Sequence, residues 1–111
     1  MAKQNIVLDK TFQFACKIIE FTNTIKVERQ YELARQLIRS GTSVGANVRE
    51  AQRAESTADF KHKLKIALKE ADETKYWLEL IHLKVYPVED LLFEEIEEII
   101  KLLVTTIKNT R

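Results

Sequence analysis

Two pairs of side chains have the spacing of a metal-binding motif. Glu79 precedes His82 by three residues, and Asp59 precedes His62 by the same interval. Glu-x-x-His supplies ligands to di-iron sites in four-helix bundles. Both pairs fall on one expected helix, about 30 Å apart, and their rotations about its axis differ by about 200°. They cannot converge within one chain, so we expect two ordinary surface or edge histidines and neither a metal nor another cofactor.

Other signatures of catalysis are missing from the sequence. Cys16, the single cysteine, has no base near it in sequence, and no glycine-rich phosphate loop, nucleophile elbow or paired-carboxylate motif occurs. We predict that the protein has no catalytic residues and is not an enzyme, and that Cys16 packs as a small apolar side chain. A lone cysteine and a start without a secretory pattern favour the reducing cytoplasm.

Arginine forms the one candidate binding surface. Five of the six arginines lie within residues 29–53, a window without lysine. On a continuous helix, a rotation of about 100° per residue places four of them within about 80° of arc, in a stripe about 27 Å long. The guanidinium fork grips phosphate oxygens, and small side chains at the middle of the stripe leave room for a phosphate backbone. The predicted nucleic-acid-binding residues are Arg35, Arg39, Arg49 and Arg53.

The alternative is that these arginines are a solvated face, or pair with Glu32, Glu50 or, between copies of the chain, acidic residues of the fourth helix. Charge nevertheless divides along the chain, although the whole sequence has a net charge of only +1. Residues 26–69 carry ten basic and five acidic side chains, whereas residues 70–98 carry two and ten. Repeated around a symmetric assembly, a basic surface would attract RNA or DNA.

Length and composition favour one helical domain that spans residues 1–111. The chain is 45% hydrophobic and 32% charged, and it contains only two glycines and one proline. Charged residues interrupt every apolar stretch well before the roughly 20 residues that a membrane span requires. We therefore expect a soluble protein that does not enter a membrane.

Four amphipathic segments follow one another with short breaks between them. The periodicity predicts helices over residues 9–23, 28–54, from about 57 to the Tyr86-Pro87 stop, and 89–108. Short connections force neighbouring helices to run antiparallel. The predicted fold is all-α, an antiparallel up-down-up-down four-helix bundle.

The third segment has the clearest pattern. Ser56 and Asp59 have the spacing of a capping box, which predicts a helix start. Its apolar seam then alternates spacings of four and three for almost four heptads, as in coiled coils. The seam consists of Phe60, Leu64, Ala67, Ala71, Thr74, Leu78, Ile81 and Val85.

Two glycines and one asparagine of the second segment require a structural reason. Gly41 and Gly45 each disfavour a helix by about 1 kcal/mol against alanine, so close packing of another helix is expected, with a kink as the alternative. Asn47 lies at the edge of the apolar face. We expect it to bond to a neighbouring helix and fix the register, with Thr74 as its partner or bonded to its own preceding turn.

Two helices carry more apolar surface than one core requires. The first has two stripes, one containing Leu8, Phe12, Ala15 and Ile19 and the other Phe14, Ile18, Phe21 and Ile25. Surplus apolar surface usually marks an interface, although a thicker core could bury both stripes. The predicted interface of a homo-oligomer consists of Phe14, Ile18, Phe21, Tyr76, Trp77 and Leu80.

The middle of the chain resembles a known family. The run Arg39–Ala51, followed by Ser56, Asp59-Phe60, Leu64, Ile66-Ala67, Glu70-Ala71, Glu73-Thr74 and Tyr76-Trp77-Leu78, is similar to the four-helix-bundle proteins encoded in 23S ribosomal RNA intervening sequences. Many members carry Pro, Ala and Gly where this chain has Gly45, Arg49 and Ala51. The family includes the accessory variability determinant of diversity-generating retroelements.

The resemblance implies a ring-like homopentamer without enzymatic activity. In the retroelement branch it also implies binding to nucleic acid and to a protein partner, a reverse transcriptase. We therefore expect a homo-oligomeric interaction scaffold, and the alternative is a nucleic-acid-binding accessory protein that uses the arginine stripe.

Overall fold

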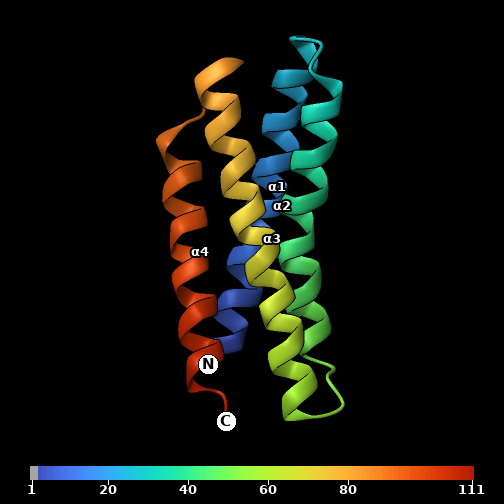
Figure 1. Ribbon diagram of the computed structural model, residues 1–111, viewed down its shortest axis with the longest axis vertical. Helices are drawn as coiled ribbons and strands as arrows, with labels where there is room; N and C mark the ends of the chain where they lie inside the picture. The colour runs from blue at the N-terminus through green and yellow to red at the C-terminus, as the bar shows by residue number, and fades with distance from the viewer. Residues whose placement is uncertain (1–2) are drawn as a thin grey trace.

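Four antiparallel helices make up the computed structural model, which describes residues 3–111. They are α1 (Lys3–Val27), α2 (Tyr31–Ala51), α3 (Thr57–Lys84) and α4 (Asp90–Asn109), and the bundle measures 44 × 22 × 20 Å. Helices that are adjacent in the sequence pack on each other, and α1 also packs on α4, so α1 and α3 lie diagonally across the bundle. Both chain ends lie at the end of the bundle that carries the α2–α3 connection (Figure 1). The predicted up-down-up-down fold is confirmed.

The ends of α1 and α2 differ from the prediction. Helix α1 continues past Asn23 to Val27, because buried Ile25 anchors its last turn in the core. Arg29 then takes a positive φ of 63°, and the amide of Gln30 donates to the carbonyl of Ile25. This is the Schellman arrangement that ends many helices. It delays the start of α2 from the expected residue 28 to Tyr31.

The start of α3 follows its predicted capping box closely. The Ser56 hydroxyl accepts a hydrogen bond from the amide of Asp59 at 3.0 Å. The Asp59 carboxylate reaches back one residue further than in the usual box and accepts from the amide of Glu55 at 3.1 Å. Six of the eight seam positions that follow are buried, and the two end positions, Phe60 and Val85, are half-buried.

The core face of α1 has a heptad-like spacing that the sequence pattern concealed. Two of its six positions are threonines, so hydrophobicity alone does not reveal it. The hydroxyls of Thr11 and Thr22 donate to the carbonyls of Val7 and Ile19, each at 2.8 Å, which allows both side chains to be buried. The buried face of α1 is Val7, Thr11, Phe14, Ile18, Thr22 and Ile25.

Close packing explains both glycines, as predicted. A Cβ on Gly41 would lie 2.9 Å from Cγ2 of Ile18, and one on Gly45 would lie 3.3 Å from the backbone of Thr11. Helix α2 is continuous through both positions and neither glycine has a positive φ. The glycines therefore let α1 and α2 approach each other.

The polar register contact was assigned to the wrong residue. The side-chain amide of Asn47 donates to the carbonyl of Ser43 in its own helix, at 2.9 Å, rather than to α3. The buried contact between α2 and α3 joins the hydroxyls of Ser40 and Thr74, which are 3.0 Å apart. Thr74 also lies 2.7 Å from the carbonyl of Glu70, one turn earlier, so its predicted bond to its own preceding turn is present, whereas its predicted pairing with Asn47 is wrong.

Candidate functional site

The predicted arginine stripe is divided between three environments. Helix α2 ends at Ala51, and the next residues form a tighter turn in which the amide of Arg53 bonds to the carbonyl of Glu50. Arg53 therefore lies beyond the helix on which the stripe was constructed. Arg35 pairs within its own helix, where its guanidinium donates to both carboxylate oxygens of Glu32, at 2.6 and 2.7 Å.

Arg39 turns toward α3 and is held by two carboxylates. It donates to Glu70 at 3.2 Å and to Glu73, whose Oε2 also accepts a 3.0 Å hydrogen bond from the indole of Trp77. The Trp77 hydrogen bond and the Arg39 guanidinium together hold the pKa of Glu73 below its usual range, and Glu73 in turn raises the pKa of Arg39. This cluster joins α2 to α3 and leaves Arg39 neutralised.

Arg49 turns the other way, toward α1. Its guanidinium carbon lies 5.8 Å from the centre of the Phe12 ring, within the range of a cation–π contact. The four arginines therefore do not form one surface. Glu32 balances the charge of Arg35, and Glu70 and Glu73 of α3 balance that of Arg39. The charge of Arg49 lies against the Phe12 ring.

An exposed apolar stripe follows the outer face of α1, and we call it the α1 stripe. Phe12 and Ile19 are 51% and 47% exposed, and Leu8 and Ala15 beside them are half-buried. Spacings of four, three and four place these side chains on one face. The α1 stripe consists of Leu8, Phe12, Ala15 and Ile19.

The α1 face that we expected at an interface packs in the core instead. Phe14 and Ile18, which we expected at an interface, are 1% and 0% exposed and belong to the core of a single chain. Phe21 is half-buried at the core edge, with its ring edge-on to Tyr86. Hydrophobicity alone did not separate the faces, because the core face includes two threonines.

A second exposed apolar stripe lies on α3, and we call it the α3 stripe. Tyr76 and Leu83 are 56% and 73% exposed, and Leu80 between them is half-buried. Exposed Asp72 and Glu79 lie within one turn of Tyr76 on the same face. Trp77, the remaining residue of the predicted interface, packs against the core edge, and its indole donates to Glu73.

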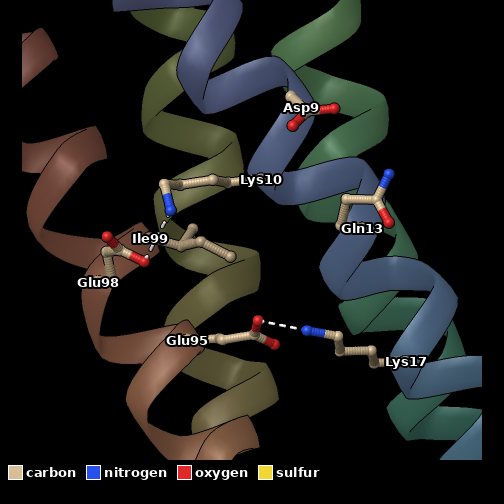
Figure 2. A pocket seen from close by; sticks show the side chains of 7 residues that line it. All are labelled: Asp9, Lys10, Gln13, Lys17, Glu95, Glu98 and Ile99. Atoms are coloured by element: carbon tan, nitrogen blue, oxygen red, sulfur yellow. Dashed lines mark hydrogen bonds and ion pairs between the residues drawn. The ribbon is translucent and has the colours of Figure 1, made fainter.

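The contact between α1 and α4 is polar on its outside. Figure 2 shows Lys10 and Lys17 of α1 reaching across to Glu98 and Glu95 of α4, at 3.1 and 2.5 Å. These ion pairs bridge a cleft of about 240 Å³ with Ile99 in its wall. The second oxygen of Glu95 is buried without a hydrogen-bond partner. Paired in this way, the carboxylates join two helices electrostatically.

The histidines are placed apart from each other. His62 is exposed near the start of α3, whereas Nδ1 of His82 accepts a 2.9 Å hydrogen bond from the amide of Val88. The His82 ring also lies edge-on to Phe93. Within residues 3–111, no group of three or more His, Cys, Asp or Glu side chains is arranged to hold a metal ion. Cys16, expected to be packed, is exposed.

Comparison with solved structures identifies a close structural relative. It is a protein of unknown function from the S23 ribosomal protein family of Bacteroides thetaiotaomicron, with 43% sequence identity and a TM-score of 0.90. The match covers 97% of this chain and 100% of that one. No curated protein matches the chain. None of the four described helices is both long and apolar enough to cross a membrane.

The family comparison agrees with the resemblance found in the central motif. The model of the 23S rRNA-intervening sequence proteins matches residues 3–105, which is almost the whole length of the four helices. The match thus extends well beyond the central motif, into α1 and α4. The chain belongs to the family of 23S rRNA-intervening sequence proteins.

Proposed function

We propose that this protein is a non-enzymatic homo-oligomeric scaffold whose assembled surface binds an outside partner. The observation that carries the proposal is that a bundle with a complete core exposes two further apolar stripes, on α1 and α3. Contiguous apolar surface on a soluble protein usually marks an interaction site. Each stripe extends over two or more helical turns, as a helix–helix contact requires.

A ring of five copies follows from the resemblance to pentameric members of the family. The same resemblance supports a protein partner such as a reverse transcriptase. The stripes support association itself, whereas the subunit number rests on the family. Assembly through apolar stripes should persist at high salt, because burial of apolar surface does not depend on unscreened charge.

Sedimentation velocity combined with light scattering tests the proposal directly. We expect the wild-type protein to have the mass of a closed oligomer, five chains on the family expectation, at both low and high salt. Val104→Arg is the matched control and should have the wild-type mass, because Val104 is an exposed apolar residue of α4 outside both stripes. A wild-type mass of one chain at all concentrations would overturn the proposal.

Nucleic-acid binding is a second candidate, supported by how charge is distributed along the bundle. The half with the α2–α3 connection contains residues 6–14, 46–69 and 99–111, with ten basic and four acidic side chains. The other half contains residues 15–45 and 70–98, with seven basic and thirteen acidic side chains. The basic half, rather than the arginine stripe, is the surface that phosphates would contact.

Charge reversal in the basic half tests this candidate. Arg53→Glu with Lys65→Glu should abolish binding to a mixed RNA and DNA pool, and wild-type binding should weaken steeply as salt rises. Arg35→Glu is the matched control, because Arg35 is an exposed cation in the acidic half. Binding that survives the double reversal, or that disappears equally with Arg35→Glu, would exclude the basic half as the site.

A further inference from the structure

We propose that copies of this chain associate head to tail, with the α1 stripe of one copy packed on the α3 stripe of the next. The inference rests on the proposed oligomeric function and names the two surfaces that build it. The partner of each stripe is therefore a second copy of the chain, and every copy uses both stripes.

The most exposed residues of the two stripes have matching spacings. Phe12 and Ile19 are seven residues apart, and so are Tyr76 and Leu83. At 1.5 Å per residue each exposed pair spans about 10.5 Å along its helix. Equal spacing allows the side chains of one helix to enter the gaps of the other, as in coiled-coil packing.

The charges beside the stripes are complementary. Arg49 lies over Phe12 at the α1 stripe, whereas exposed Asp72 and Glu79 flank Tyr76 at the α3 stripe. Lys75, within one turn of both carboxylates, is occupied by Glu97 of α4. Pairing unlike stripes brings Arg49 toward two carboxylates. Pairing two α3 stripes would bring carboxylates together, which is unfavourable.

The arrangement of the helices makes the contact heterologous. Because α1 and α3 lie diagonally across the bundle, their outer faces point in different directions. Contacts between different surfaces produce either closed rings or open filaments. The α1 stripe lies on the side of α1 that is nearer to α2, because Arg49 of α2 covers Phe12. The two stripes are therefore not back to back, so each added copy turns relative to the last.

This pairing also assigns a role to Arg49. Arg49 makes a cation–π contact but no ion pair among the described residues. Asp72 or Glu79 of the adjacent copy supplies the missing partner. Arg49 is then an assembly residue, and phosphate binding, if present, uses other cations of the basic half.

A mixing experiment with two half-defective variants tests the pairing. Phe12→Asp damages only the α1 stripe and places a carboxylate opposite Asp72 and Glu79. Leu83→Arg damages only the α3 stripe, because it places a cation in the apolar contact. Each variant alone should be monomeric in light scattering, and an equimolar mixture should form a one-to-one dimer and nothing larger, through the one intact stripe on each partner. Circular dichroism melting checks that both variants fold.

The outcomes separate this inference from the proposed function. A monomeric wild-type protein would overturn both. An oligomeric wild type with variants that also remain oligomeric, or with a mixture that remains monomeric, would overturn the head-to-tail pairing alone. Dimers formed by Phe12→Asp by itself would instead indicate that two α3 stripes pair with each other.

Two further measurements locate the contact within the stripes. Arg49→Glu should weaken assembly about tenfold, and adding Asp72→Arg and Glu79→Arg should restore it. Cys16 lies four residues after Phe12 and three before Ile19, and its thiol is exposed in the single chain. A thiol reagent should therefore react at least tenfold more slowly with the wild-type assembly than with Phe12→Asp. Equal reaction rates, or no rescue by the charge exchange, would contradict the proposed contact.

Discussion

Gly41 of α2 lies directly against Ile18 of α1, and a Cβ on the glycine would be 2.9 Å from Cγ2 of the isoleucine. Ile18 is fully buried, and its β-branched side chain has little freedom to move away. The contact sets the distance between the two helices. The helix propensity lost at Gly41 is therefore offset by packing.

Gly41→Ala should destabilise the protein although alanine favours helix. Alanine gains about 1 kcal/mol of propensity, but overpacking a well-filled core costs about 1–3 kcal/mol, so we expect a net loss of about 1 kcal/mol in the free energy of unfolding. Urea denaturation measures this loss of unfolding free energy. Ala46→Gly, at an exposed position of α2, is the control and should lose about 1 kcal/mol from propensity alone.

A double-mutant cycle with Ile18→Ala identifies the cause. If the clash is responsible, Ile18→Ala should be less damaging in the Gly41→Ala background than in the wild type, by more than about 0.5 kcal/mol. Additive effects would mean that Gly41 is required for a reason other than Ile18.

The fold was predictable where periodicity and capping agreed. Helix α3 carries an uninterrupted heptad and the Ser56 cap, and both its start and its buried seam were predicted correctly. The roles of the α1 faces were not predictable, because two core positions are occupied by Thr11 and Thr22. Their burial depends on hydrogen bonds to carbonyls of the same helix, which hydrophobicity does not report.

The candidate site was less predictable than the fold. Rotation placed Arg39 and Arg49 in one stripe, but it could not reveal that Arg39 meets Glu73 of α3 and Arg49 meets Phe12 of α1. Partners on other helices depend on tertiary register. Arg53 was placed on the helix although the helix ends at Ala51. The tighter turn that follows contains no glycine or proline, so the sequence did not indicate it.

The hydroxyl pair of Ser40 and Thr74 should contribute to the pairing of α2 with α3. Thr74→Val keeps the shape but removes the hydroxyl, and we expect a loss of about 1–2 kcal/mol in unfolding free energy. Ser40→Ala should lose about 1 kcal/mol. The double variant should lose less than the sum, because neither hydroxyl is then left without its partner. Thermal or urea unfolding of all four proteins measures the coupling, and strict additivity would contradict it.

Glu73 should make stability depend on pH in the acid range. Its pKa is lowered in the folded state, first by the Trp77 hydrogen bond and then by Arg39, so the unfolded state binds its proton more readily. The stabilisation is therefore present above the ordinary glutamate pKa of about 4.3 and is lost as pH falls through the lower folded value. Denaturation across this range should show a weaker pH dependence for Glu73→Gln than for wild type. Glu20→Gln, on the exposed side of α1, is the control and should follow the wild-type curve.

The residue that ends α1 offers a route to higher stability. Arg29 has a φ of 63°, a left-handed conformation that disfavours residues with a Cβ by about 1–2 kcal/mol. Arg29→Gly should raise the unfolding free energy by about 0.5–1 kcal/mol, because part of the relief is offset by the greater freedom of glycine in the unfolded chain. Glu28→Gly, one residue earlier, is the control and should not stabilise. If both glycines act alike, backbone strain at Arg29 is not the cause.

His82 should secure the connection between α3 and α4. Its Nδ1 accepts the amide hydrogen of Val88 just after Pro87, and Val88 is buried. Proline has no amide hydrogen, so few backbone bonds close this connection, and the imidazole replaces one of them. His82→Ala should leave the Val88 amide without its acceptor and lower the unfolding free energy by about 1 kcal/mol.

Hydrogen exchange at Val88 should accelerate about tenfold, whereas exchange in the middle of α3 should change only as much as global stability does. His62→Ala, which removes an exposed histidine near the other end of α3, should leave both quantities unchanged. If Val88 exchanges no faster in His82→Ala than the loss of global stability requires, the imidazole does not hold the connection and the α3–α4 turn is fixed by the packing of Val88 alone.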